Sequence, residues 1–89
     1  AQVYHALWKN RRYPPVAQRM GYEGEVEVTF TVAADGGIRN VRITRESDYG
    51  VLNREVESLL DRTRRFPPFP ADLPAQSLTF RIAIPFKLS

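Results

Sequence analysis

The segment Gln76-Ser-Leu-Thr-Phe-Arg-Ile-Ala-Ile-Pro-Phe-Lys-Leu88 decides how this chain is expected to fold. Every second residue from Leu78 to Leu88 is apolar. Because the side chains of a strand alternate between its two faces, this spacing predicts a β-strand with one buried and one solvated face. Pro85 has no N–H to donate to a neighbouring strand, so we expect the segment to lie at a sheet edge. Such an edge is either protected against aggregation or reserved for a partner strand.

Two further strands are expected earlier in the chain. Residues 25–32 alternate cleanly between apolar and polar, and Asp35-Gly36-Gly37 is a turn signal that leads into a return strand over residues 38–45. The apolar residues of the return strand fall out of step by one. This slip predicts a bulge near Arg39 and Asn40.

Three helices are expected around these strands. The first covers residues 3–12, and the second covers residues 16–20 after Pro15. The third runs from residue 50 to about residue 64, with Ser47 or Asp48 as its N-cap. Its inward residues form one stripe at helical spacing: Leu52, Val56, Leu59, Leu60 and Thr63.

The order of these elements predicts the topology. The return strand and the last strand are joined through a helix, so they should run parallel to each other. A fully antiparallel three-stranded sheet then requires the strand order 2-1-3, with the last strand at an edge. With all helices on one face, the expected fold is an α+β two-layer sandwich. The stripe of the third helix is expected to pack on Val26, Val28, Phe30, Ile43, Phe80, Ile82 and Ile84.

Length and composition indicate a single domain. The 89 residues are expected to form one domain over residues 1–89, in which residues 1–12 are an N-terminal helical extension. The chain begins with Ala1 rather than Met, so we expect it to be a piece of a longer protein. It contains no cysteine, which excludes disulfides and thiolate metal sites.

The polar residues contain no recognisable catalytic set. His5 is the only histidine, and none of the serines is expected to lie near a base. Glu25 and Glu27 alternate with valines, so a solvated sheet face explains them better than a pair of catalytic carboxylates does. We therefore expect no enzymatic activity, no metal site and no cofactor.

The arginines of the return strand raise the question of nucleic-acid binding. The net charge of the chain is only +3, which is weak evidence for such a partner. The adjoining strand carries Glu25 and Glu27, whose charges cancel much of the positive field, and no aromatic residue interleaves with the arginines. We expect no nucleic-acid partner and interpret the chain as a protein-binding module.

Several short motifs occur in a characteristic order between Tyr13 and Leu88. They are Tyr13-Pro14 followed by Ala17, Gly21-Tyr-Glu-Gly24, Asp35-Gly36, Asn40-Val41, Ser47 with Leu52, Phe66-Pro67-Pro68-Phe69-Pro70, and the ending Ile84-Pro85-Phe86-Lys87-Leu88. In order and spacing they resemble the C-terminal domain of TonB-like energy transducers.

This resemblance implies a periplasmic domain of a protein that is anchored in the inner membrane by an N-terminal helix. Such proteins work with inner-membrane partners driven by the proton gradient. They transmit that energy to outer-membrane receptors for iron-siderophore, haem or cobalamin. Contact is made through a short receptor segment, the TonB box, which adds as a strand beside the last strand of the domain. Pro85 independently predicts that this edge is free.

Two groups of residues are expected to bind the receptor: Asn10, Arg12, Tyr13 and Pro14 before the second helix, and Ser77, Thr79, Arg81, Ala83, Pro85 and Lys87 on the last strand. Arg11 and Arg12 stand where better-known members carry a glutamine-rich segment. Tyr13 and Pro14 either contact the receptor or only anchor the chain on the core. The free edge could also pair with itself and give a homodimer. A TolA-like domain, or another envelope interaction module unrelated to iron or haem uptake, is the alternative.

Overall fold

Three helices and three strands make up the described part of the chain. The computed structural model describes residues 2–63, 65–74 and 76–88. The elements are α1 (Gln2–Asn10), α2 (Pro15–Met20), β1 (Gly24–Ala33), β2 (Ile38–Arg45), α3 (Gly50–Thr63) and β3 (Ser77–Phe86). None of the helices in these ranges is both long enough and apolar enough to cross a membrane.

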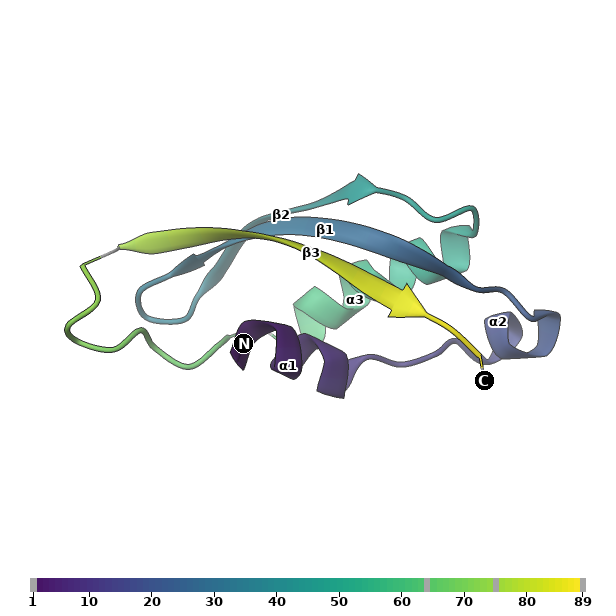
Figure 1. Ribbon diagram of the computed structural model, residues 1–89, viewed down its shortest axis with the longest axis horizontal. Helices are drawn as coiled ribbons and strands as arrows, with labels where there is room; N and C mark the ends of the chain where they lie inside the picture. The colour runs from purple at the N-terminus through teal and green to yellow at the C-terminus, as the bar shows by residue number, and fades with distance from the viewer. Residues whose placement is uncertain (1, 64, 75, 89) are drawn as a thin grey trace.

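The sheet forms one layer, and the helices lie on one side of it (Figure 1). The strand order is β2-β1-β3, and both neighbouring pairs are antiparallel. The predicted α+β two-layer sandwich with strand order 2-1-3 is therefore confirmed. In the described ranges no element covers the other face of the sheet, which we call the open face.

β1 and β3 pair regularly along their whole length. The register runs from Gly24 opposite Phe86 to Ala33 opposite Ser77 without a shift. The apolar residues of both strands therefore share the face that turns toward the helices. The strand expected at the end of the chain is confirmed as an edge strand.

β1 and β2 pair with two irregularities. One register shift lies between Thr29 and Thr31, and a second lies between Glu27 and Val28. At the first shift Asn40 has a positive φ of 56°, a backbone conformation that Asn adopts more readily than most residues. The bulge predicted near Arg39 and Asn40 is thus confirmed, whereas the second irregularity was not predicted.

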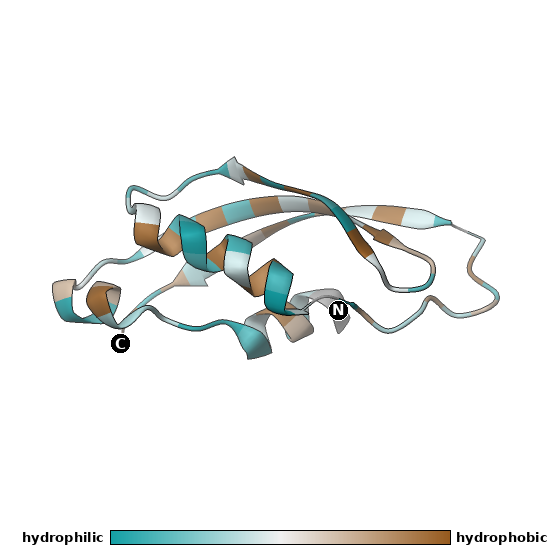
Figure 2. Cartoon of the chain, turned by 180° about the vertical axis from the view of Figure 1, so that it is seen from behind, coloured by the Kyte–Doolittle hydropathy of each residue, from teal (hydrophilic) through white to brown (hydrophobic). Residues whose placement is uncertain are grey.

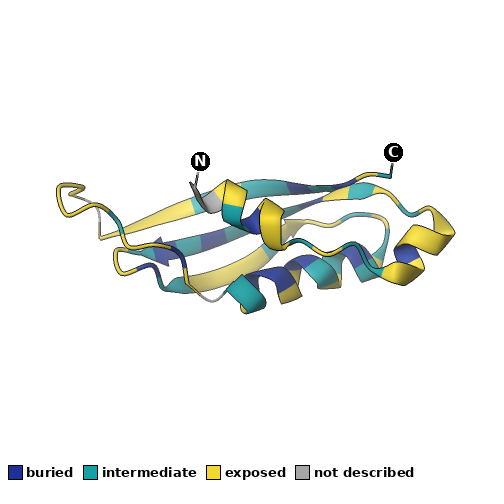
Figure 3. Ribbon diagram, turned by 90° about the horizontal axis from the view of Figure 1, so that it is seen from below, coloured by how far each residue is buried: buried dark blue, intermediate teal, exposed yellow. Residues whose placement is uncertain are grey.

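The core lies between the sheet and the helices (Figure 3). The four apolar residues of the α3 stripe are buried as predicted, with Leu52, Val56 and Leu59 at 0% exposure, whereas Thr63 is only half-buried. Figure 2 shows how apolar and polar segments alternate along α3 and β1, as expected for elements with one face in a core. The other buried apolar residues are Leu7, Ala17, Val26, Val28, Phe30, Val32, Leu60, Phe66, Ile84 and Phe86.

The helical layer does not cover all three strands equally. α3 packs mainly on β1 and β2. Phe80 and Ile82 of β3 are consequently half-buried, and Leu78 is 39% exposed. On the other edge Val41 is 40% exposed. The apolar residues of the two edge strands, β2 and β3, are therefore only partly buried. The reason is that these strands extend beyond α3, the helix that was expected to cover them.

The predicted turn between β1 and β2 is confirmed, and it is fastened to the chain that follows α3. Gly36 has a φ of +92°, and a Cβ atom there would lie 1.8 Å from the carbonyl oxygen of Phe66. The N–H of Phe66 donates to the carbonyl oxygen of Gly36 at 2.8 Å. Only glycine satisfies both the positive φ and this close approach.

Three local expectations differ from the structure. α1 ends at Asn10 rather than Arg12, because the N–H of Arg12 donates to Glu55 Oε2 at 3.0 Å instead of continuing the helix. The Ser47 hydroxyl donates to Asn53 Oδ1 at 2.8 Å, and its oxygen accepts from the N–H of Tyr49 at 3.2 Å, the residue before α3, rather than from an amide of the helix. The expected helix end near Arg64 falls outside the described residues, and α3 is described as far as Thr63.

Candidate partner-binding edge

The outer side of β3 is an open sheet edge. β1 pairs with the inner side of β3 over all ten residues of the strand. Within the described residues no other strand pairs with the outer side. The backbone groups on that side are therefore available to an added strand.

One hydrogen bond shows which residues present these backbone groups. The N–H of Ala34 donates to the carbonyl oxygen of Gln76 at 2.8 Å, just beyond the pair formed by Ala33 and Ser77. In an antiparallel ladder, hydrogen-bonded and non-hydrogen-bonded residue pairs alternate. Since Ala34 and Gln76 are hydrogen-bonded, the next pair, Ala33 and Ser77, is not, and every second pair along β3 is likewise not hydrogen-bonded. The backbone groups that point away from β1 consequently belong to Ser77, Thr79, Arg81, Ala83 and Pro85.

These five residues are all among those predicted to bind a partner. Pro85 offers only its carbonyl oxygen, so its missing N–H faces the free side and breaks no bond to β1. Pro85, from which the edge strand was predicted, therefore lies at a position of the sheet where a proline is tolerated.

The edge carries exposed polar side chains at Ser77, Thr79 and Arg81, and half-buried apolar ones at Ala83 and Pro85. Thr79 Oγ1 lies 3.2 Å from Thr31 Oγ1 of β1. Arg81 Nε lies 3.8 Å from Glu27 Oε1, and the Arg81 side chain is 71% exposed. Lys87 is exposed just beyond the end of the strand. An approaching acidic group would meet the positive charges of Arg81 and Lys87, with the charge of Arg81 partly compensated by Glu27.

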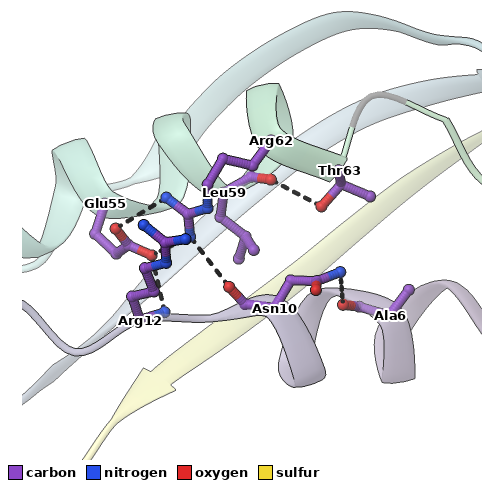
Figure 4. Close-up of polar contacts among 7 residues, drawn as sticks. All are labelled: Ala6, Asn10, Arg12, Glu55, Leu59, Arg62 and Thr63. Atoms are coloured by element: carbon purple, nitrogen blue, oxygen red, sulfur yellow. Dashed lines mark hydrogen bonds and ion pairs between the residues drawn. The ribbon is translucent and has the colours of Figure 1, made fainter.

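The N-terminal candidates Asn10 and Arg12 are held against α3 (Figure 4). The carbonyl oxygen of Asn10 accepts a hydrogen bond from Arg62 Nη2 at 3.1 Å, and the backbone N–H of Arg12 donates to Glu55. Arg62 and Glu55 themselves form a salt bridge of 2.7 Å, in which the Glu55 side chain is 9% exposed. One ion pair on α3 therefore fixes the path of the chain between α1 and α2.

Tyr13 and Pro14 are both built into the fold. The Tyr13 ring packs edge-on against Phe86 with a centroid distance of 5.5 Å, and its hydroxyl donates to the carbonyl oxygen of Tyr22. Burial raises the pKa of Tyr13, the nearby charge of Glu23 adds to this effect, and Arg11 opposes it. Pro14 is the N-cap residue of α2, and its carbonyl oxygen accepts from the N–H of Gln18 at 3.0 Å.

Arg11 is a prominent residue that the sequence did not single out as a binding candidate. Its guanidinium carbon lies 4.5 Å from the ring centroid of Trp8 and 5.2 Å from that of Phe86. Its Nε and Nη1 atoms are buried without a hydrogen-bond partner among the described residues. The ring faces supply the electrostatic stabilisation instead. Phe86 is remote from Arg11 in the sequence, so no local pattern could reveal this contact.

The predicted N-terminal group reaches the end of β3 through Tyr13. Phe86, the last residue of the strand, contacts both Arg11 and Tyr13 of the N-terminal segment. Residues 10–14 thus lie beside the C-terminal end of the free edge. No group of three or more His, Asp or Glu residues in the described ranges is arranged to hold a metal ion.

Residues 9–88 match the family described as the Gram-negative bacterial TonB protein C-terminal. This chain belongs to that family.

Two curated relatives and one solved structure illustrate the similarity to other members of the TonB C-terminal family. The chain is 30% identical to protein TonB of Helicobacter pylori strain 26695 over 88 residues, and the aligned region covers 98% of this chain and 29% of that protein. It is 35% identical over 78 residues to protein TonB of Escherichia coli K12, covering 86% of this chain and 33% of that protein. The solution structure of the Helicobacter pylori TonB C-terminal domain superimposes with a TM-score of 0.79 at 28% identity, covering 99% of this chain and 78% of that one.

The similarity concerns a part of each relative. This chain spans about a third of the length of these TonB proteins.

Proposed function

We propose that this domain binds a short segment of an outer-membrane receptor, the TonB box, by adding it as a fourth strand to the outer side of β3. The observation that carries this proposal is the row of outward backbone groups at Ser77, Thr79, Arg81 and Ala83. Main-chain hydrogen bonds supply affinity in strand addition, while neighbouring side chains supply selectivity. Membership of the TonB C-terminal family supports the choice of partner.

The domain acts, in this proposal, as the periplasmic end of a non-enzymatic energy transducer. A preceding region anchors the protein in the inner membrane and contacts partners driven by the proton gradient. The domain transmits their energy to a receptor that imports iron-siderophore, haem or cobalamin. The roughly one-third share of the relatives' length that this chain spans leaves room for such a region in a longer protein.

Arg81 and Lys87 would favour a receptor segment that carries an acidic residue. Both are exposed, so each pair with a carboxylate should contribute only about 0–1 kcal/mol. The residues near Phe86, in particular Asn10, Arg12, Tyr13 and Pro14, would meet the part of the receptor that extends past the end of β3. The same edge could pair with a second copy of the chain, which would compete with the receptor.

An NMR titration of the isotope-labelled domain with a TonB-box peptide tests the proposal. Strand addition should shift the amide signals of Ser77, Thr79, Arg81 and Ala83 most strongly, because their N–H groups gain a hydrogen-bond acceptor. A peptide of the same composition in scrambled order serves as the control for sequence selectivity.

The pattern of shifts decides between the alternatives. Shifts confined to the turn near Gly36 or to α3 would exclude strand addition at β3. No shift with TonB-box peptides from several receptors would favour a TolA-like or other envelope module with a different partner.

A further inference from the structure

The exposed arginines of β2 have an unusual arrangement. Arg39, Arg42 and Arg45 follow one another at intervals of three residues. In a regular strand the side chains alternate, so residues three apart point to opposite faces. A regular β2 would therefore place Arg42 on the face opposite to the other two.

The two bulges of β2 bring all three arginines to the open face. Arg39 lies opposite Thr31, Arg42 opposite Thr29, and Arg45 opposite Glu27. These partners are every second residue of β1, and directly opposed residues share a face. Each bulge adds one extra residue to β2 between two successive arginines. The side chains of the arginines before and after the bulge therefore point to the same face. We call these three residues the arginine row.

The spacing of the row follows from the spacing of its partners on β1. Two residues of an antiparallel strand span roughly 7 Å along the strand axis. The arginines are therefore attached to the sheet at intervals of about 7 Å along β1. An extended polypeptide repeats its own side chains on one face at the same interval.

Among the described residues, the arginines of the row are not held in ion pairs. All three arginines are exposed, and none forms a salt bridge in the part of the chain that the structure describes. Glu27 lies on the same face, but it pairs with Arg81 and accepts a hydrogen bond from Thr44 Oγ1 at 2.9 Å. Glu25 also lies on this face, but on β1, so the exposed side chains of β2 on the open face carry positive charge only.

The centre of the open face is a shallow polar pocket beside the row. Its volume is about 550 Å³, and it is lined by Thr29, Thr31, Asn40, Arg42 and Thr79. Hydroxyl and amide groups can both donate and accept hydrogen bonds, as a peptide backbone requires. The lining contains no aromatic ring on which a nucleobase could stack.

We propose that the arginine row binds an extended acidic segment of a partner protein, one that carries carboxylates at every second residue. Each carboxylate would meet one arginine, and the backbone of the segment would lie over the threonine-lined pocket. This site lies on the open face along β2, whereas the receptor segment of the preceding proposal lies in the plane of the sheet beyond β3. The two partners could therefore bind at the same time.

A comparison of three peptides tests the spacing argument. The first is Thr-Glu-Thr-Glu-Thr-Glu-Thr, the second is its isomer Thr-Thr-Glu-Glu-Glu-Thr-Thr, and the third replaces every Glu of the first by Gln. NMR titration should show the tightest binding for the first peptide, with amide shifts at residues 29–31, 39–45 and 79. Raising the ionic strength from about 0.01 M to about 0.15 M should weaken that binding, because exposed charges are screened.

Substitutions then locate the site. The triple variant Arg39→Gln, Arg42→Gln and Arg45→Gln should bind the first peptide about tenfold more weakly. The matched control Lys9→Gln, Arg19→Gln and Arg54→Gln removes the same charge from exposed positions on the helices and should bind like the original chain. If the triple variant does not fold, the single variant Arg42→Gln replaces it.

The possible results are distinct from those for the β3 edge. Equal affinity for the two isomeric peptides, equal losses in both triple variants, or no binding would overturn the proposal. Equally strong shifts of the same amides with anionic lipid vesicles or an oligonucleotide would also overturn it, since the row would then recognise charge alone. Shifts limited to the amides of β3 would assign acidic peptides to the edge instead.

Discussion

The two edges of this sheet differ in regularity, although both flank the same central strand. β3 pairs with β1 over ten residues without a register shift, whereas β2 is interrupted twice and contains a residue with positive φ. A long regular edge is a template for a further strand, while bulges and exposed charges discourage edge pairing. One sheet can therefore keep one edge open to partners and protect the other.

The largest effect should come from removing the packing of α3 on the central strand that both edges flank. Leu59 is fully buried on α3, which packs on β1 and β2. Leu59→Ala should cost about 2–5 kcal/mol of the free energy of unfolding. In a domain of 89 residues this is a large part of the total stability. Thermal unfolding followed by circular dichroism measures the loss, and a shift of the melting temperature by only a degree or two would contradict the packing described here.

A pair of proline substitutions tests the orientation of the β3 backbone. The N–H of Ile82 points toward β1, so Ile82→Pro should remove a ladder hydrogen bond and destabilise the fold by about 3 kcal/mol or more, through the lost bond, the lost packing and the strained chain. The N–H of Ala83 points away, so Ala83→Pro should spare folding and weaken the binding of an added strand. Denaturant titration and peptide binding measure the two effects. The opposite result, with Ala83→Pro the more destabilising change, would reverse the assignment of the free backbone groups.

The irregular edge can be tested at Asn40. Its positive φ of 56° is unfavourable for β-branched residues. Asn40→Val should therefore cost about 1–2 kcal/mol, whereas Asn40→Gly should be neutral or slightly stabilising. The midpoints of denaturant unfolding distinguish these outcomes. If Asn40→Val were as stable as the original chain, the bulge would not depend on this backbone conformation.

The smallest loss of stability is expected for a substitution of Tyr13, which packs against the end of the regular edge strand β3. Tyr13→Phe removes the hydrogen bond to Tyr22 and should cost about 1 kcal/mol at neutral pH. Because the pKa of Tyr13 is raised in the folded state, its contribution is complete below the ordinary tyrosine value of about 10 and is lost as the pH rises through the raised pKa. Stability measured from neutral pH to above the raised pKa should therefore fall less for Tyr13→Phe than for the original chain.

The same variant separates the two roles left open for Tyr13. A loss of stability with unchanged peptide affinity would indicate that Tyr13 only anchors the chain on the core. A loss of affinity beyond the change in stability would indicate a contact with the receptor.

Much of the fold could be predicted because it follows from local alternation. The apolar residues at every second position identify β1 and β3, and those at helical spacing identify α3. The strand order then follows from the way the elements are connected. The edge position of β3 could be predicted because Pro85 lacks an N–H group, which is a property of one residue rather than of its surroundings.

Parts of the candidate site could not be predicted because they depend on contacts between distant residues. Arg11 is enclosed by Trp8 and Phe86, and Arg12 is turned away from the helix by Glu55. These partners are brought close only when α1, α3 and β3 pack together. The sequence shows that these charged and aromatic residues are present, but it does not show that they are close to one another in the fold.

The elements, their order and the existence of a free edge follow from the amino-acid sequence, because they depend on side-chain periodicity and on the chemistry of single residues. Which backbone groups that edge presents, and which arginines share a face, becomes visible only in the folded sheet. Both depend on the register between strands, and a shift of one residue turns every following side chain to the other face of the sheet.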